Sequence, residues 1–235
     1  MNQQVNTNEK PEIIYEHTVS GVFLRRNNRF TAEVMIGGRQ ETVHVKNTGR
    51  LGELLVPEAK VTLQRMNSPQ RTTKYDLISV YRPGFEWINV DSLAPNALMK
   101  LYLESLYERV KPEYTYGNSR FDFYAEKGEN HFLHEVKGCT LSYDRQSGIG
   151  YFPDAPTERG VKHLEELAKA VKEGYFCSID FVIQMNGIHL VLPNDQTQPQ
   201  FGRALERARE AGVKVNYHSC FVEADRICLT EGNQC

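Results

Sequence analysis

The chain has 235 residues, a formal net charge of −2 and a hydrophobic content of 40%, which suit a globular protein with a substantial core. No apolar run approaches the roughly 20 residues of a membrane span, so no membrane partner is expected. Its five cysteines are odd in number and lack any C-x-x-C spacing, so the sequence suggests neither a disulfide framework nor a zinc site and fits a reducing cytoplasm.

The charges divide the chain into two modules. Residues 13–82 carry 11 Lys and Arg against 6 Asp and Glu, whereas residues 83–235 carry 16 against 22. A basic module joined to an acidic one suits a protein that holds a polyanion with one part and cations with the other, although a chance surface imbalance gives the same counts. We therefore expect a binding module at 13–82 and a second domain at 83–235, after a polar, disordered tail at 1–12.

The first module is predicted to be all-β. Five short strand-like runs lie between residues 17 and 82, separated by the turn signals RNN, GGR and SPQ. Short antiparallel strands in so small a unit must close on themselves to hide their edges, which predicts an OB-type barrel. Such barrels often bind nucleic acid through one face. The expected nucleic-acid contacts are Arg25, Arg26, Arg29, Asn47, Arg50, Arg71 and Lys74.

Three aromatic residues of the barrel, Phe23, Phe30 and Tyr75, are available for base stacking. Filling the barrel interior is the better expectation for each of them. The NTG segment at 47–49 is either a phosphate-cradling turn or an ordinary barrel turn, and the neighbouring Arg50 slightly favours the first.

The second module is predicted to be a mixed sheet flanked by helices. A helix begins near Ala94, and the order that follows is α-β-β-α-β-β-α-β. The later elements are expected as strands at 120–125 and 131–138, a helix at 157–174, strands at 177–184 and 187–192, a helix at 199–212 and a strand at 213–219.

Polar side chains interrupt the first two of these strands. Side chains alternate across a strand, so Glu135 and Lys137 share one face. On the same rule Asp122 points away from Phe121 and Phe123. The loop EKGEN joins the two strands as a hairpin, which would bring Asp122 close to Glu135.

This arrangement predicts a cation site with Asp122, Glu135 and the backbone carbonyl of Val136 as ligands. Oxygen ligands of this kind suit a hard cation, here Mg²⁺ or Mn²⁺. Lys137 would orient an attacking water and stabilise charge on a scissile phosphate. The alternative is a salt-bridged edge strand without catalytic function.

The pattern D-x12-E-x-K on two strands after a helix resembles that of the PD-(D/E)XK nuclease superfamily. A second segment, GYFPDAPTERGVKHLEEL at 150–167, resembles the signature of the sugar fermentation stimulation protein A (SfsA) family. The segments YGNSRFDF, EVKGCTL, RFTAEV and NTGRLGELL resemble further motifs of that family, so the resemblance extends from about residue 19 to 222.

The resemblance implies a restriction-endonuclease-like α/β domain of the PD-(D/E)XK type behind the smaller OB-type barrel. It also implies a DNA-binding protein and metal-dependent nuclease, or alternatively a non-catalytic, non-specific DNA-binding regulator of sugar (maltose) metabolism. DNA is expected rather than RNA, with a nucleoid-associated location and a homodimer as a candidate assembly. The implied site comprises the metal ligands Asp122 and Glu135, the catalytic Lys137, and the supporting Thr157, Arg159 and His163.

Two of the supporting residues start the helix at 157–174. Arg159 lies where the helix N-terminus would favour a phosphate. Thr157 is equally well explained as the N-cap of that helix.

Overall fold

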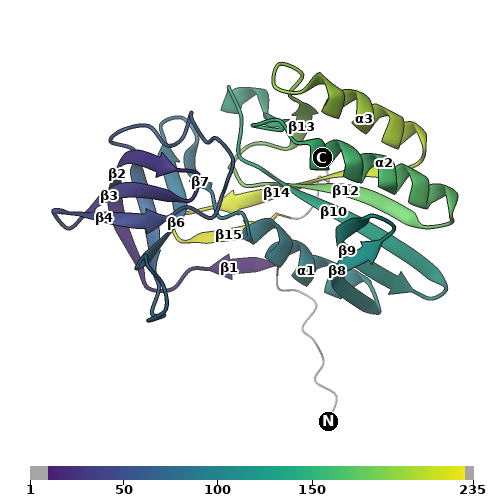
Figure 1. The fold of residues 1–235 in the computed structure, drawn as a ribbon, viewed down its shortest axis with the longest axis horizontal. Helices are drawn as coiled ribbons and strands as arrows, with labels where there is room; N and C mark the ends of the chain where they lie inside the picture. The colour runs from purple at the N-terminus through teal and green to yellow at the C-terminus, as the bar shows by residue number, and fades with distance from the viewer. Residues whose placement is uncertain (1–9, 231–235) are drawn as a thin grey trace, which may run out of the picture.

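Five strands close into a barrel in the first part of the chain (Figure 1). The structure is a computed structural model that describes residues 10–230, so residues 1–9 of the predicted tail lie outside the described residues. Strand β4 pairs in parallel with β6 at His44 and Asp76, which completes the ring. The barrel strands are β2 (Thr18–Asn28), β3 (Thr31–Ile36), β4 (Arg39–His44), β5 (Lys60–Arg65) and β6 (Tyr75–Arg82).

A sixth strand, β7 (Glu86–Asn89), pairs with β6 and continues this sheet past residue 82, where the sequence analysis placed the boundary. The barrel interior is apolar and includes Phe23, Val34 and Leu63. Alternation with exposed residues on β2 and β4 follows from one face of each strand packing into that interior.

A seven-stranded sheet forms the second part, in the order β1-β15-β14-β12-β10-β9-β8. Its three central strands, β10, β12 and β14, are parallel, and the strands toward both edges are antiparallel. The strands are β1 (Glu12–Ile14), β8 (Arg109–Tyr116), β9 (Ser119–Lys127), β10 (Asn130–Cys139), β12 (Phe176–Ile183), β14 (Lys214–Val222) and β15 (Arg226–Leu229).

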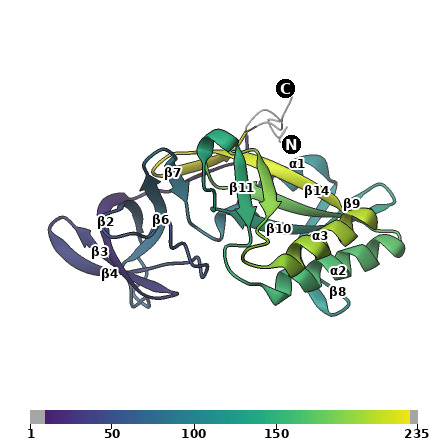
Figure 2. The same ribbon diagram turned by 90° about the horizontal axis from the view of Figure 1, so that it is seen from above.

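Helices cover both faces of this sheet. Helix α1 (Ala94–Leu106) lies on one face, while α2 (Glu158–Lys172) and α3 (Pro199–Glu210) lie on the other (Figure 2). Both α1 and α3 carry proline in the first turn, where the missing N–H costs nothing. A two-stranded sheet of β11 (Ile149–Phe152) and β13 (Leu190–Pro193), and the short 3₁₀ helix η1 (Arg145–Ser147), complete the domain.

Together these elements form a mixed α/β domain behind an OB-type barrel, as the sequence predicted. Five strands were not predicted. Strands β1, β7, β11 and β15 have only three or four residues, too few to show a period. Strand β8 is an edge strand with mostly exposed side chains, so its alternation is weak. Strand β1 precedes the barrel in sequence yet pairs with β15, which ties the start of the described chain to the second sheet.

None of the helices between residues 10 and 230 is long and apolar enough to cross a lipid bilayer.

Candidate active site

Asp122 lies where the pairing of β9 with β10 ends. The last pair of that ladder is His134 with Phe123, one step before Asp122 would face Glu135. There the carboxylate replaces a backbone acceptor, because the amide of Val136 donates to Oδ2 of Asp122 at 2.8 Å. Asn96, in the first turn of α1, donates its Nδ2 to Oδ1 at 2.8 Å. The structure therefore brings Asp122 to the segment that carries Glu135, as the sequence predicted. It also places Asn96 at this carboxylate, a contact that the sequence did not predict.

The strict alternation expected around Asp122 is wrong. The ring of Phe121 lies 5.6 Å from that of His163 on α2, whereas Phe123 belongs to the cluster under α1 on the other face. The residue between the β8 partners of these two phenylalanines is Glu113, whose φ is 54°. Backbone in this region departs from strand geometry, which accounts for the change of face.

Glu135 is 2% exposed, and its two oxygens have different surroundings. Lys137 Nζ and His163 Nδ1 both contact Oε1. Oε2 is buried and has no hydrogen-bond partner among the described residues. Lys137 lies on the predicted face of β10, two residues after Glu135.

His163 is held from both sides. One turn earlier on α2, Arg159 donates Nε–H to Nε2 of His163 at 3.3 Å. That bond leaves the ring proton on Nδ1, where it points at Glu135. The order Arg159, His163, Glu135, Lys137 is thus a continuous chain of polar contacts.

The pKa values of Asp122 and Glu135 shift in opposite directions. Burial and then the charge of Glu135 raise the pKa of Asp122 above its ordinary value. Burial also acts to raise the pKa of Glu135, but the charge of Lys137 and the hydrogen bond from His163 outweigh it, and the net shift is downward.

Two features of these carboxylates suit a divalent cation. Oε2 of Glu135 is a buried acceptor without a partner among the described residues, and burial followed by the charge of Glu135 raises the pKa of Asp122, a penalty that a cation would reduce. Within residues 10–230, no group of three or more His, Cys, Asp or Glu side chains is placed to hold a metal ion. Further ligands would therefore be backbone oxygen, water or substrate.

Thr157 is the N-cap of α2. Its Oγ1 accepts from the amide of Gly160 at 3.0 Å, while its own N–H donates to Oε1 of Gln198 at 2.8 Å. The capping alternative from the sequence is therefore realised. Thr157 fixes the start of the helix that carries Arg159 and His163.

A basic hollow lies beside the acid site. Its volume is about 690 Å³, and it is lined by Asn118, Ser119, Arg120, Glu158, Arg159, Lys162 and His163. Three of these side chains carry positive charge and are exposed. A phosphate in this hollow would meet Arg159 on one side and the His163–Glu135 contact behind it.

Arg26 does not present its guanidinium to a ligand. Nη1 donates to the carbonyl oxygens of Gly49 at 2.6 Å and Arg50 at 2.9 Å. Nη2 donates to those of Asn47 at 2.7 Å and Arg29 at 2.8 Å, and Nε donates to that of Asn28 at 3.1 Å. Every N–H group is occupied, so Arg26 holds the NTG loop in place instead of reaching a phosphate as expected.

The other predicted contacts of the barrel differ in availability. Arg71 pairs with the buried Asp76, which restrains it. The side chains of Arg25, Arg29, Arg50 and Lys74 are exposed.

Of the aromatic residues, Phe23 fills the barrel, Tyr75 packs partly against its core, and Phe30 is exposed with Arg29 4.7 Å above its ring.

The NTG loop meets the second domain at a cleft of about 380 Å³. Asn47 accepts from the amide of Gly49 through its Oδ1 at 2.8 Å, so its side chain shapes the turn. The amide of Arg50 donates to Oδ2 of Asp154 at 3.1 Å, which links barrel and second domain.

Lys46 links the same two parts from β4 toward α1. Its Nζ lies 2.8 Å from Oδ2 of Asp91 and 3.5 Å from Oδ2 of Asp76.

Comparison with known proteins identifies a family that shares this architecture. Residues 24–90 match the family model described as SfsA N-terminal OB domain, and residues 91–226 match the model described as sugar fermentation stimulation protein RE domain. A sugar fermentation stimulation protein homolog of Desulfitobacterium hafniense (strain DSM 10664 / DCB-2) is 48% identical over 217 residues, which cover 91% of this chain and 93% of that protein.

Another homolog, from Clostridium beijerinckii, is 45% identical over 222 residues, covering 92% of this chain and 96% of its own. The solved structure of Pyrococcus furiosus SfsA in complex with Ca²⁺ superposes with a TM-score of 0.81 at 25% identity, covering 94% of this chain and 96% of that one.

The protein is therefore of a two-part class, in which an OB domain precedes a mixed α/β domain. Both family models match in chain order and together span most of the sequence. The chain belongs to the sugar fermentation stimulation protein (SfsA) family.

Proposed function

We propose that this chain is a metal-dependent nuclease of the PD-(D/E)XK superfamily that hydrolyses phosphodiester bonds in DNA. The observation that carries the proposal is the asymmetric environment of Glu135. Lys137 and His163 contact Oε1, whereas Oε2 remains buried without a partner among the described residues. A salt bridge that served stability alone would gain most by satisfying both oxygens.

Asp122, Glu135 and the carbonyl of Val136 would hold Mg²⁺ or Mn²⁺. Such an ion supplies Lewis acidity toward a phosphoryl oxygen and lowers the pKa of water. Lys137 provides a cation on the same strand face, where it positions a water and offsets charge on the phosphate. His163 orients Glu135 through Nδ1–H and is itself held by Arg159.

The relative from Pyrococcus furiosus supports the cation in this proposal. Its structure contains Ca²⁺, and the two chains share their fold over nearly their full lengths. Ca²⁺ and Mg²⁺ are both hard cations that select oxygen ligands, the only kind Asp122 and Glu135 provide.

DNA binding would involve both parts of the chain. The exposed Arg25, Arg29, Arg50 and Lys74 supply phosphate contacts on the barrel, and the basic hollow at Arg159 receives the phosphate next to the acid pair. Arg26, Asn47 and Arg71 act on the shape of this surface through their internal contacts.

The direct test is cleavage of labelled single- and double-stranded DNA and RNA with Mn²⁺ or Mg²⁺. The native chain is compared with Glu135→Gln, Lys137→Ala and the exposed control Glu104→Gln on α1. We expect cleavage of DNA by the native chain and the control, and a rate at least about a hundredfold lower in the two site variants. Chelation should abolish cleavage in every case.

The same experiment decides the alternative. A native chain that binds DNA but cleaves none of the substrates, or site variants that cleave as fast as the native chain, would support a DNA-binding regulator with a nuclease-like fold. Location at the nucleoid and homodimer formation remain predictions under either function.

A further inference from the structure

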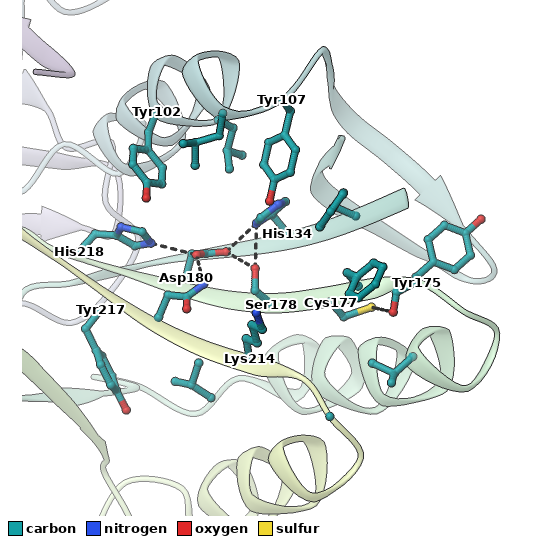
Figure 3. Close-up of a pocket in the computed structure, with 18 of the residues that line it drawn as sticks. Tyr102, Tyr107, His134, Tyr175, Cys177, Ser178, Asp180, Lys214, Tyr217 and His218 are labelled. Atoms are coloured by element: carbon teal, nitrogen blue, oxygen red, sulfur yellow. Dashed lines mark hydrogen bonds and ion pairs between the residues drawn. The ribbon is translucent and has the colours of Figure 1, made fainter. Parts of the chain in front are cut away.

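A second cavity extends over the face of the sheet that carries α1, behind the candidate active site, and reaches round to Val171, Val215 and Tyr217 on the side of α2 and α3 (Figure 3). Its volume is about 890 Å³, within the usual range for pockets that hold small organic ligands. Helix α1 contributes Tyr102, the residue directly after it is Tyr107, and β10 contributes His134. Because His134 and Glu135 are successive residues, the cavity and the acid pair use opposite faces of one strand.

The floor of the cavity is organised by Asp180 on β12, which is 1% exposed. Oδ1 accepts from Nδ2 of Asn216 at 2.8 Å and Nε2 of His218 at 2.9 Å. Oδ2 accepts from Oγ of Ser178 at 2.6 Å and Nδ1 of His134 at 3.0 Å. Four donors saturate the carboxylate, so it fixes the surrounding side chains and has no capacity left for a ligand.

His134 retains one free hydrogen-bonding atom. Because Asp180 accepts from Nδ1, the ring proton resides there and Nε2 is an acceptor. His134 is 6% exposed, and its Nε2 has no partner among the described residues. A buried acceptor that lines a cavity calls for a donor supplied by whatever occupies the cavity.

Aromatic rings form the walls. Tyr107 lies 4.7 Å from Phe132 and 5.4 Å from His134, and Tyr102 lies 5.3 Å from His218, all measured between ring centroids. Figure 3 shows the rings of both tyrosines directed toward the floor, Tyr102 from α1 and Tyr107 from just past its end. Flat π-faces around one buried acceptor suit a planar ring that carries an N–H group.

The rim is apolar with one cation. Leu106 is 41% exposed and Phe176 is 52% exposed, so large hydrophobic side chains border the opening. Lys214, at the start of β14, also lines the cavity and is exposed. An anionic group attached to the planar ring would find its counter-charge there.

We propose that this cavity binds a nucleobase bearing an N–H donor, with the base against the aromatic side chains that line the cavity, its N–H directed at His134 Nε2 and its phosphate near Lys214. This site goes beyond the proposed nuclease activity, because neither Asp122 nor Glu135 takes part in it. The base belongs either to a free nucleotide or to a nucleic-acid strand, since both present the same chemistry.

Isothermal titration calorimetry of the full chain tests the site. The ligands are adenosine 5′-monophosphate, the monophosphate of purine riboside, which lacks the amino group, and a short single-stranded DNA. We expect saturable binding at one site per chain, with the adenine compound about tenfold tighter than the purine compound, since only it can donate to His134. No saturable binding of any ligand overturns the proposal, as does equal affinity for the two monophosphates.

Variants locate the site and show whether the base belongs to a free nucleotide or to a nucleic-acid strand. Tyr107→Ala should weaken binding about tenfold. His134→Phe should bind the two monophosphates with equal affinity. If circular dichroism shows that His134→Phe does not fold, the result with Tyr107→Ala decides alone. The exposed Tyr143→Ala should bind as the native chain does. If only the oligonucleotide binds, a loss with Tyr107→Ala assigns the base to a strand, and unchanged binding overturns the site.

Discussion

Nδ1 of His163 contacts Oε1 of Glu135, although 28 positions separate the two residues in the chain. This contact helps Lys137 to hold the pKa of Glu135 down against the effect of burial. Removing it in His163→Ala raises the pKa of Glu135, so a smaller fraction is ionised at a given acidic pH. We therefore expect the acid limb of the pH–rate profile for DNA cleavage to move to higher pH.

Glu165→Gln, on the exposed side of the same helix, is the control and should keep the native profile. A His163→Ala variant that loses rate equally at every pH would show that the histidine acts only on folding or packing.

Divalent metal should stabilise the folded chain through the same acids. Burial and the charge of Glu135 raise the pKa of Asp122, so the ionised carboxylate weakens the metal-free fold as pH rises through that raised pKa. A cation removes this penalty. At a metal concentration about 100 times Kd, linkage gives about 2.7 kcal/mol, which raises Tm by about 5–10 °C in a chain of this size.

The measurement is thermal unfolding with and without Mn²⁺, at pH 6 and pH 8. Asp122→Asn and Glu135→Gln should lose most of the Mn²⁺ effect, and the native increment should be larger at pH 8, where protons compete less. An equal increment in both variants would place the bound metal elsewhere.

Local rules predicted the parts of this site that depend on one strand. Glu135 and Lys137 share a face because alternation holds along β10. The same rule failed at Asp122, because the departure from strand geometry at Glu113 lies on the neighbouring strand and leaves no mark in the residues around Asp122. Propensity and period carry no information about such cross-strand distortions.

Arg26 shows the same limit for charged residues. Its sequence neighbours Arg25 and Arg29 are exposed, and nothing in the pattern separates it from them. What distinguishes Arg26 is a set of carbonyl oxygens around the NTG loop, 21 to 24 positions away. The role of this guanidinium follows from the closed barrel, which brings that loop back to β2.

Arg25 and Arg26 should therefore respond differently to the same substitution. Arg26→Met removes five hydrogen bonds, three of them to the loop, and should lower the free energy of unfolding by about 2–4 kcal/mol. Arg25→Met should leave stability within about 0.5 kcal/mol of native and reduce the salt dependence of DNA binding by about 0.9 in the log–log slope. Urea unfolding and filter binding at several salt concentrations measure the two effects, and equal destabilisation by both variants would contradict this assignment.

The polar cluster around Asp180 could be predicted in part from the sequence. Ser178 and Asp180 interrupt the apolar strand FCSIDFVI at alternate positions, which places both on one face. Their partners His134 and His218 come from β10 and β14, and only the parallel order of the three strands makes them neighbours. A buried acid was thus foreseeable at Asp180, but its four donors were not.

Asp180→Asn should be among the most destabilising single changes in the chain. Burial opposes the charge of Asp180, but hydrogen bonds from His134 and His218 prevail and hold its pKa far below the ordinary value. An amide cannot accept all four donors, so we expect a loss of about 3 kcal/mol in the free energy of unfolding. Ser178→Ala, which removes one donor and keeps the charge, should cost about 1 kcal/mol.

The pH dependence of this loss follows from the sign of the shift. A carboxylate whose pKa is lowered by folding contributes its full stabilisation above the unfolded value, about 3.9, and loses it progressively below. The deficit of Asp180→Asn should therefore persist at pH 5 and decline only below about pH 4. Urea unfolding at pH 7, 5 and 3.5 tests this, and a deficit already lost at pH 5 would mean that the native fold holds Asp180 protonated.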